Sequence, residues 1–227
     1  MNTRFIAVLA LLLPTVAIAQ TARYPLTSPA NLRPHNVVVE PATLHGKKGL
    51  KVVAAQLTVP AGTTVETLAL ITGLEFGDGV IEAEIAGDVL PGAPEGARGF
   101  VGIAFRVQDD LKTYDAFYLR PTNGRADDQV RRNHSAQYIS HPDWPWFRLR
   151  KEFPSRYESY VDLVPGTWTK VKIEVRGEQA RLYVHAMEQP ALIVNDVRSG
   201  ANGKGAVALW IDVGTVAHFR NLSVSKK

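Results

Sequence analysis

The residues best suited to chemistry gather in one segment, 120–146, which reads RPTNGRADDQVRRNHSAQYISHPDWPW. Arginine offers a planar fork of hydrogen-bond donors, asparagine offers both donor and acceptor, and tyrosine offers an amphipathic ring. Such groups suit vicinal hydroxyls or a carboxylate. The segment therefore predicts a ligand site that includes Arg120, Asn123, Arg131, His134 and Tyr138.

Two tryptophans lie in a turn of the same segment, HPDWPW at 141–146, which its prolines stiffen. Rigid, exposed aromatic rings are surfaces on which the apolar face of a sugar can stack. The same rings could instead plug one end of a β-sandwich. Both interpretations stay open for Trp144 and Trp146, and we include both residues in the predicted ligand site.

Acid–base chemistry has a weaker signature in this sequence. His134 is the only candidate catalytic residue, and a structural hydrogen-bonding role is favoured for it. A structural interpretation also exists for the segment as a whole, because Asp127 and Asp128 can pair with Arg131 and Arg132 to hold a long loop in shape. No HExxH motif, histidine cluster or EF-hand loop is present, so no metal site is expected.

Two strands are expected to lead into this segment and to orient part of the site. Apolar residues alternate over 101–107 and 114–120 around a polar DDLK turn, a pattern typical of paired antiparallel strands. Because successive side chains of a strand point to opposite faces of the sheet, one set enters a core and the other set lies on the opposite face. The opposite face is predicted to carry Arg106, Tyr118 and Arg120 around a hollow left by Gly102, Ala104 and Ala116.

Similar short alternating runs bounded by glycine-rich turns occur along the rest of the chain, and no run of ten or more residues has a helical period. The pattern predicts an antiparallel all-β sandwich or barrel with helices of at most a turn or two. Strands are expected at 37–40, 50–55, 67–72, 80–86, 101–107, 114–120, 158–163, 168–176, 179–185, 191–194, 206–212 and 216–224. Core positions are expected at Val101, Ile103, Phe105, Phe117, Leu119, Val171, Ile173, Leu182, Val184, Val207, Leu209 and Ile211.

Several of these strands resemble the signatures of the concanavalin A-like lectin/glucanase superfamily: FGDGVIEAEIAG, GFVGIAFRV, YDAFYLRP, GTWTKVKIEVRGEQARLYVH and GAVALWIDVGTVAHFRNLSV. They are most similar to laminin-G-like domains and to the 3-keto-disaccharide hydrolase type. The resemblance covers residues 35–224 and implies a two-sheet antiparallel jelly roll whose concave sheet and rim loops carry any glycan site. It leaves room for a structural calcium ion on the rim, and no other cofactor is expected.

The resemblance also bears on the carboxylate pair Glu82 and Glu84, which would share one strand face about 6.5 to 7 Å apart. Many glycosidases use two carboxyl groups at such a separation. The surrounding sequence, IEAEIAGD, lacks the ExDxxE arrangement of the superfamily's laminarinase-type glucanases. We therefore interpret this pair as part of a solvated face.

The N-terminal residues predict export. An early arginine, an apolar run and an Ala-Ile-Ala site make residues 1–19 a secretory signal peptide, cleaved after Ala19. Residues 20–34, which contain three prolines, are expected to form an extended lead-in that packs late or not at all, and residues 35–227 a single jelly-roll domain. No later stretch approaches the roughly 20 apolar residues of a membrane span. A periplasmic or secreted location follows.

The net charge and the cysteine content limit which classes of partner and which cross-links the sequence predicts. The formal net charge of +4 is too small to predict binding to nucleic acid, and the absence of cysteine excludes disulfides. We expect a carbohydrate ligand, because binding needs only the surface of aromatic, arginine and asparagine side chains that the sequence supplies. Two alternatives stay open: a glycoside hydrolase of the 3-keto-disaccharide hydrolase type, and a structural domain that binds a protein partner.

Overall fold

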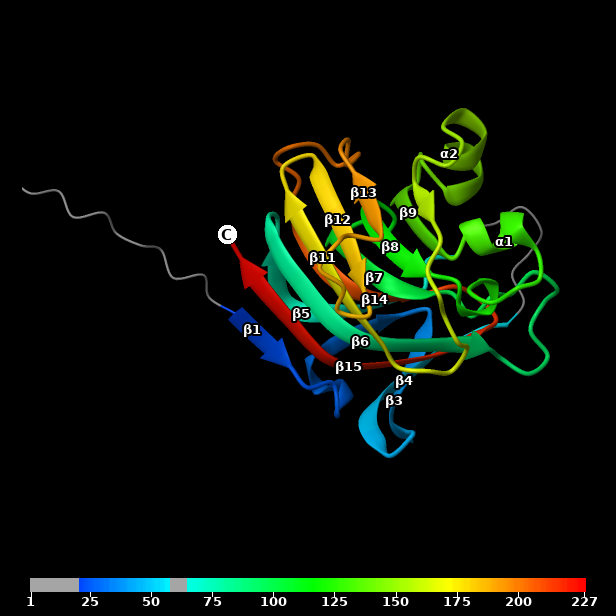
Figure 1. The fold of residues 1–227 in the computed structure, drawn as a ribbon. Coiled ribbons are helices and arrows are strands. Elements are labelled where there is room, and N and C mark those ends of the chain that lie inside the picture. The colour runs from blue at the N-terminus through cyan, green and yellow to red at the C-terminus, as the bar shows by residue number, and fades with distance from the viewer. Residues whose placement is uncertain (1–20, 58–64) are drawn as a thin grey trace, which may run out of the picture.

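The computed structural model describes residues 21–57 and 65–227, in which strands predominate and form two antiparallel sheets (Figure 1). The larger sheet contains β1 (Thr21–Tyr24), β3 (Val37–Leu44), β4 (Lys47–Ala54), β6 (Gly79–Val89), β11 (Thr169–Arg176), β12 (Gln179–Val184), β13 (Leu192–Val194) and β15 (Thr215–Lys226). Its order is β13-β12-β11-β6-β15-β4-β3, with β1 paired to β15. Strands from both ends of the chain thus lie side by side.

The second sheet carries the segment on which the sequence analysis centres. It contains β2 (Leu32–His35), β5 (Leu68–Phe76), β7 (Val101–Val107), β8 (Tyr114–Leu119), β9 (Ala136–His141), β10 (Glu158–Ser159) and β14 (Gly205–Ile211). Their order is β10-β9-β8-β7-β14-β5-β2. The predicted pairing of 101–107 with 114–120 is confirmed as β7 and β8, and the two-sheet jelly-roll sandwich is confirmed with it.

The core forms where the apolar alternation predicts it. Phe105 stacks on Phe117 with ring centroids 6.2 Å apart, and Phe76 meets Phe105 edge-on at 6.4 Å. Burying such aromatic rings supplies much of the hydrophobic stabilisation of a sandwich. Every residue predicted for the core is buried: Val101, Ile103, Phe105, Phe117, Leu119, Val171, Ile173, Leu182, Val184, Val207, Leu209 and Ile211.

Helices are short, as predicted: η1 (Pro29–Asn31), η2 (Pro121–Asn123), α1 (Gln129–Asn133) and α2 (Trp146–Glu152). The two α-helices lie on the side of the molecule that holds β8 and β9 (Figure 1), whereas η1 contacts β3. The sequence analysis treats 121–146 as one loop, which is wrong in one respect: β9 lies inside it and pairs with β8. The strand expected at 158–163 is limited to the two residues of β10.

From residue 21 onward, the lead-in expected over 20–34 is more ordered than the sequence indicates. β1 pairs with β15 at Tyr24 and Leu222, and β2 pairs with β5 at Pro34 and Ala69. Proline fits there because β2 is an edge strand of its sheet. The signal peptide predicted for 1–19 lies outside the described residues. Within them, no helix is both long and apolar enough to cross a membrane.

Candidate functional site

A cavity of about 720 Å³ opens where β8 ends, and it brings together five of the residues predicted for the ligand site. Four parts of the chain form its wall: the 94–100 segment, the stretch 120–134, α2, and the two residues that follow β14. The predicted residues that line it are Arg120, Asn123, Arg131, His134 and Trp146. The sequence analysis did not find Arg98, Phe100, Arg150 or Asp212, which line it as well.

Arg120 forms the floor of this cavity and is almost completely buried. Its Nη2 donates to Tyr118 Oη at 2.8 Å and to Gln137 Oε1 at 3.1 Å, and its Nη1 donates to the carbonyl oxygen of His134 at 2.8 Å. The guanidinium carbon lies 5.0 Å from the centre of the Tyr118 ring and 5.8 Å from that of Trp146. Arg120 therefore links the sheet to the loop that carries the other site residues.

Tyr118 is buried beneath Arg120 instead of facing an open hollow. Its ring stacks on Trp210 with centroids 4.6 Å apart, and burial raises the pKa of Tyr118 to about 12. The small residues around it leave no room for a ligand: Ala104 and Ala116 are fully buried, and a Cβ added at Gly102 would lie 2.5 Å from Tyr118 Cβ. The predicted hollow is therefore filled by the protein itself.

Glu158 is a buried carboxylate on which three cavity side chains converge. Nε of Arg150 donates to both carboxylate oxygens at 3.1 Å, and Nη2 of Arg150 donates to Oε1. Arg120 Nη1 lies 3.5 Å from Oε1, and His134 Nδ1 lies 2.8 Å from Oε2. The Nδ1 edge of the His134 ring therefore lies against the Glu158 carboxylate.

The pKa of His134 is lowered, chiefly by burial, and the neighbouring charge of Glu158 opposes that shift without overcoming it. Arg150 and Arg120 lower the pKa further, because their positive charges disfavour the imidazolium. A neutral imidazole held against a carboxylate is suited to accepting a proton or a hydroxyl hydrogen bond.

Asp212 brings a carboxyl group of low exposure to the cavity wall, directly after β14. Its Oδ1 accepts a hydrogen bond from the Val213 N–H at 2.7 Å, and burial raises the pKa of the carboxyl above its usual value. In the sequence Asp212 begins DVGT, whose composition is typical of a turn. Phe100 reaches the same region and meets Tyr118 edge-on at 5.9 Å. Asp212 follows β14 and Phe100 precedes β7, and both residues come close to β8 because β8, β7 and β14 are neighbours in the strand order.

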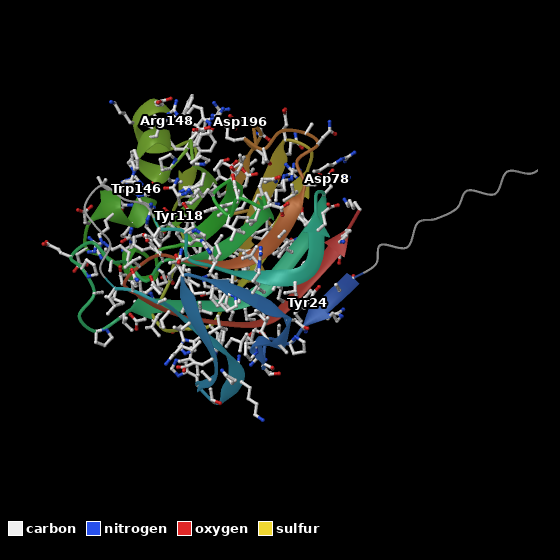
Figure 2. All side chains as sticks on the ribbon, turned by 180° about the vertical axis from the view of Figure 1, so that it is seen from behind. Tyr24, Asp78, Tyr118, Trp146, Arg148 and Asp196 are labelled. Carbon is white, nitrogen blue, oxygen red and sulfur yellow. The ribbon has the colours of Figure 1, made fainter. Side chains whose placement is uncertain are left out.

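The two predicted tryptophans lie in different places. Trp146 begins α2, is 43% exposed and lines the cavity, with the Arg150 guanidinium carbon 4.7 Å from its ring centre. Figure 2 shows it on the same side of the molecule as Tyr118. Trp144 is held between the guanidinium groups of Arg148 at 4.0 Å and Arg198 at 4.3 Å. It lines another cavity, of about 750 Å³.

Arg106 was predicted beside Tyr118 and lies elsewhere, because a β-bulge interrupts the alternation. Ala104 pairs with Ala208, whereas Val107 pairs with Ala206, so β7 has one extra residue there. Arg106 takes the left-handed conformation, with φ of 55°, and is fully buried. Its guanidinium donates to Asp78 Oδ1 and to the carbonyl oxygens of Gly77, Gly177 and Gly200 at 2.9 to 3.2 Å.

Tyr138 was also predicted to meet the ligand, and it points into the sandwich. It pairs directly with Phe117 across β8 and β9, so the two rings share the core face and lie 5.4 Å apart. Its hydroxyl donates to the buried Asp115 Oδ1 at 2.6 Å and accepts from the Arg198 N–H at 3.0 Å. Four predicted residues therefore do not line the cavity that holds the other five: Arg106, Tyr118, Tyr138 and Trp144.

Comparisons with known proteins identify the fold. No protein-family model matches the sequence, and no curated protein is significantly similar to it. A carbohydrate-binding module from Bacillus subtilis superposes with a TM-score of 0.51 at 12% identity, covering 85% of this chain and 97% of that one. A galectin-like protein of unknown function from Bacillus subtilis gives 0.54 at 11%, covering 90% and 94%. A candidate glycosyl hydrolase from Parabacteroides distasonis gives 0.51 at 11%, covering 91% and 100%.

The chain therefore has the concanavalin A-like, galectin-like jelly-roll fold. At these identities the likeness concerns the fold, which hosts binding modules and enzymes alike.

Proposed function

We propose that the protein is an exported carbohydrate-binding domain that recognises a glycan or sugar derivative on its concave face, in the cavity lined by Arg120 and Trp146. The observation that carries the proposal is the exposed Trp146 ring beside planar donors of fixed orientation. A sugar needs an aromatic surface for its C–H face and directed donors and acceptors for its hydroxyls. Asn123 holds the donors of the same wall in place, because its buried side chain accepts from Arg131 Nε at 2.9 Å and donates to the carbonyl oxygen of His134 at 3.2 Å.

Two further points support this proposal. The fold is shared with a carbohydrate-binding module, and the cavity volume of about 720 Å³ lies in the range of small-ligand sites. Export to the periplasm or beyond rests on the signal peptide predicted at 1–19, and it would bring such a domain into contact with extracellular glycans.

The test compares two neighbouring aromatic residues of α2. Trp146 lines the cavity, whereas Phe147 is 60% exposed and does not. On an array of glycans, followed by calorimetry with those that bind, Trp146→Ala should weaken binding about fivefold to tenfold, since ring stacking contributes on the order of 1 kcal/mol. Phe147→Ala should leave affinity unchanged, and both variants should unfold at the wild-type urea concentration.

Two results would contradict the proposal: no glycan binds saturably, or the two substitutions weaken binding equally. Arg120→Ala is a less selective probe, because Arg120 is buried and also bonded to Tyr118 and Gln137. Removing the Arg120 side chain would lower the free energy of unfolding together with any affinity for a glycan.

A second candidate function is hydrolysis of a glycoside, of the 3-keto-disaccharide type. His134 and Asp212 favour it, because burial lowers the pKa of the imidazole and raises that of the carboxyl, and both groups line one cavity. Release of product from 3-keto-glycosides that His134→Ala abolishes, with ligand binding retained, would establish it. Saturable binding without product would leave the domain a binding module.

A further inference from the structure

We propose that the cavity selects anionic glycans, in which a carboxylate or sulfate group on the sugar ring pairs with Arg98 and Arg131. This inference rests on the proposed glycan binding and names the class of ligand. Its basis is the distribution of charge in the cavity wall, where some guanidinium groups have carboxylate partners and others have none among the described residues.

Four arginines line the cavity: Arg98, Arg120, Arg131 and Arg150. Arg120 and Arg150 both pair with Glu158. In the part of the chain that the structure describes, no ion pair joins Arg98 or Arg131 to a carboxylate. The residues outside it, 1–20 and 58–64, contain no Asp or Glu. These two guanidinium groups therefore have no ion-pair partner among the described residues, and the remaining residues supply no acidic side chain.

Arg131 is held in place by neutral acceptors. Its Nε donates to Asn123 Oδ1 at 2.9 Å, and its Nη2 donates to the hydroxyl of Thr122 at 3.2 Å. These bonds fix the guanidinium without compensating its charge, so the group is preorganised for an external anion. Within the described residues, Asn123 and Thr122 are its only side-chain acceptors.

Arg98 adds a second unpaired cation close to the first. Its Nη1 donates to the carbonyl oxygen of Ala97 at 2.8 Å. The pKa of Arg98 is lowered, first by burial and next by the positive charge of Arg131; the negative charge of Glu95 opposes this shift, and Arg120 adds a smaller lowering contribution. This repulsion is the electrostatic cost that a bound anion would relieve.

The acidic residues of the wall do not cancel this excess. Glu95 and Asp128 are exposed at the rim, where water screens them. Asp128 uses Oδ1 to accept the Arg131 N–H at 2.9 Å and so caps α1. Only Glu158 and Asp212 lie in or beneath the inner wall, against four guanidinium groups. The interior is therefore left positive.

The experiment uses ligands that differ only in charge. Polygalacturonate is compared with its fully methyl-esterified form, and a sulfated galactan with the unsulfated polymer, by calorimetry on the full mature chain. At least one acidic polymer should bind ten or more times tighter than its neutral counterpart, and added salt should reduce that advantage. The arm that shows the difference identifies the anion as carboxylate or sulfate.

Variants then locate the effect. Arg131→Gln and Arg98→Gln should each weaken binding of the acidic polymer about tenfold or more, since a charge-assisted hydrogen bond is lost. The control is Arg125→Gln, because Arg125 is exposed, pairs with Asp162 and does not line the cavity. It should leave affinity unchanged. Because the ligand comparison uses the wild-type chain, it stands even if a variant folds poorly.

The outcomes separate the two proposals. If charged and neutral polymers bind equally and Trp146→Ala still weakens both, glycan binding stands and selection for anions is overturned. If acidic polymers bind but Arg125→Gln weakens them as much as Arg131→Gln does, the attraction is general surface charge, and the site is again overturned. If no glycan binds in any form, the proposed function itself fails.

Discussion

At the scale of single residues, Glu158 determines the geometry of the cavity. Its side chain is 3% exposed and contacts Arg120, Arg150 and His134. Replacing it with glutamine would leave buried guanidinium groups without their counter-charge. We expect Glu158→Gln to lower the free energy of unfolding by about 3 to 5 kcal/mol, the usual result of removing one partner of a buried ion pair. Urea denaturation measures this directly.

The control for that substitution is Glu152→Gln. Glu152 pairs with Arg148 one helical turn away, and both side chains are about two-fifths exposed. A surface pair of this kind contributes roughly 0 to 1 kcal/mol. If the two substitutions destabilise the protein equally, Glu158 is not the structural centre of the cavity.

The sequence could predict part of the cavity, because several of its residues are close together along the chain. Arg120, Asn123, Arg131 and His134 belong to one polar segment, and Trp146 ends it. Arg98 and Asp212 come from segments far away in sequence, which only the strand order brings near. No local pattern distinguishes their positions, since one lies in a glycine-rich loop and the other in a turn.

At the scale of elements, the bulge in β7 has a role that alternation alone could not predict. It turns Arg106 toward the turns that end the strands of both sheets: Gly77 and Asp78 between β5 and β6, and Gly177 between β11 and β12. In Figure 2, Asp78 lies across the molecule from Trp146. Arg106 thus holds one end of the sandwich closed, far from the candidate site.

We therefore expect Arg106→Gln to reduce stability and leave ligand affinity unchanged. The loss should reach about 3 kcal/mol or more, because the buried guanidinium group is removed and three partly buried carbonyl oxygens lose their donor together. Arg176→Gln provides the control, since Arg176 is exposed at the end of β11. Denaturation and glycan calorimetry on both variants give the comparison. A drop in affinity for Arg106→Gln without a change in stability would contradict this role.

β9 shows how a polar composition can conceal a strand. Its sequence, AQYISH, follows Arg- and Asn-rich residues and precedes a proline turn, so the sequence analysis assigned it to a binding loop. Pairing with β8 decides instead where each side chain points: Tyr138 lies beside Phe117 in the core, and Gln137 lies beside Tyr118 and accepts from Arg120. Gln137 therefore supports the site, whereas its neighbour Tyr138 is the residue that the sequence predicted there.

At the scale of the whole molecule, the fold was predictable because nearly every strand has one face on a common core. Alternation of apolar side chains reports that face directly, as at Phe105 and Phe117. The lead-in was less predictable: Pro25, Pro29 and Pro34 suggest weak packing, whereas the available edges of both sheets provide partners for β1 and β2. Whether a segment pairs depends on such edges as well as on its own composition.

The arrangement of strands leads to a final prediction about unfolding. In one sheet β15 lies between β6 and β4, and in the other β14 lies between β7 and β5. Each sheet thus interleaves strands from the beginning and the end of the chain (Figure 1), so neither half of the chain contains a complete sheet. We expect residues 35–227 to unfold as one cooperative unit.

Tryptophan fluorescence and far-UV circular dichroism should therefore give coincident urea transitions. Trp210 lies in β14 of one sheet, and Trp168 lies directly before β11 of the other sheet, so the fluorescence signal reports both sheets. Phe117→Ala should shift both curves together and lower the free energy of unfolding by about 3 to 5 kcal/mol, because it opens a cavity beside Phe105 and Tyr138. Transitions that separate, or a substitution that moves only one of them, would show that the two sheets unfold independently despite sharing this core.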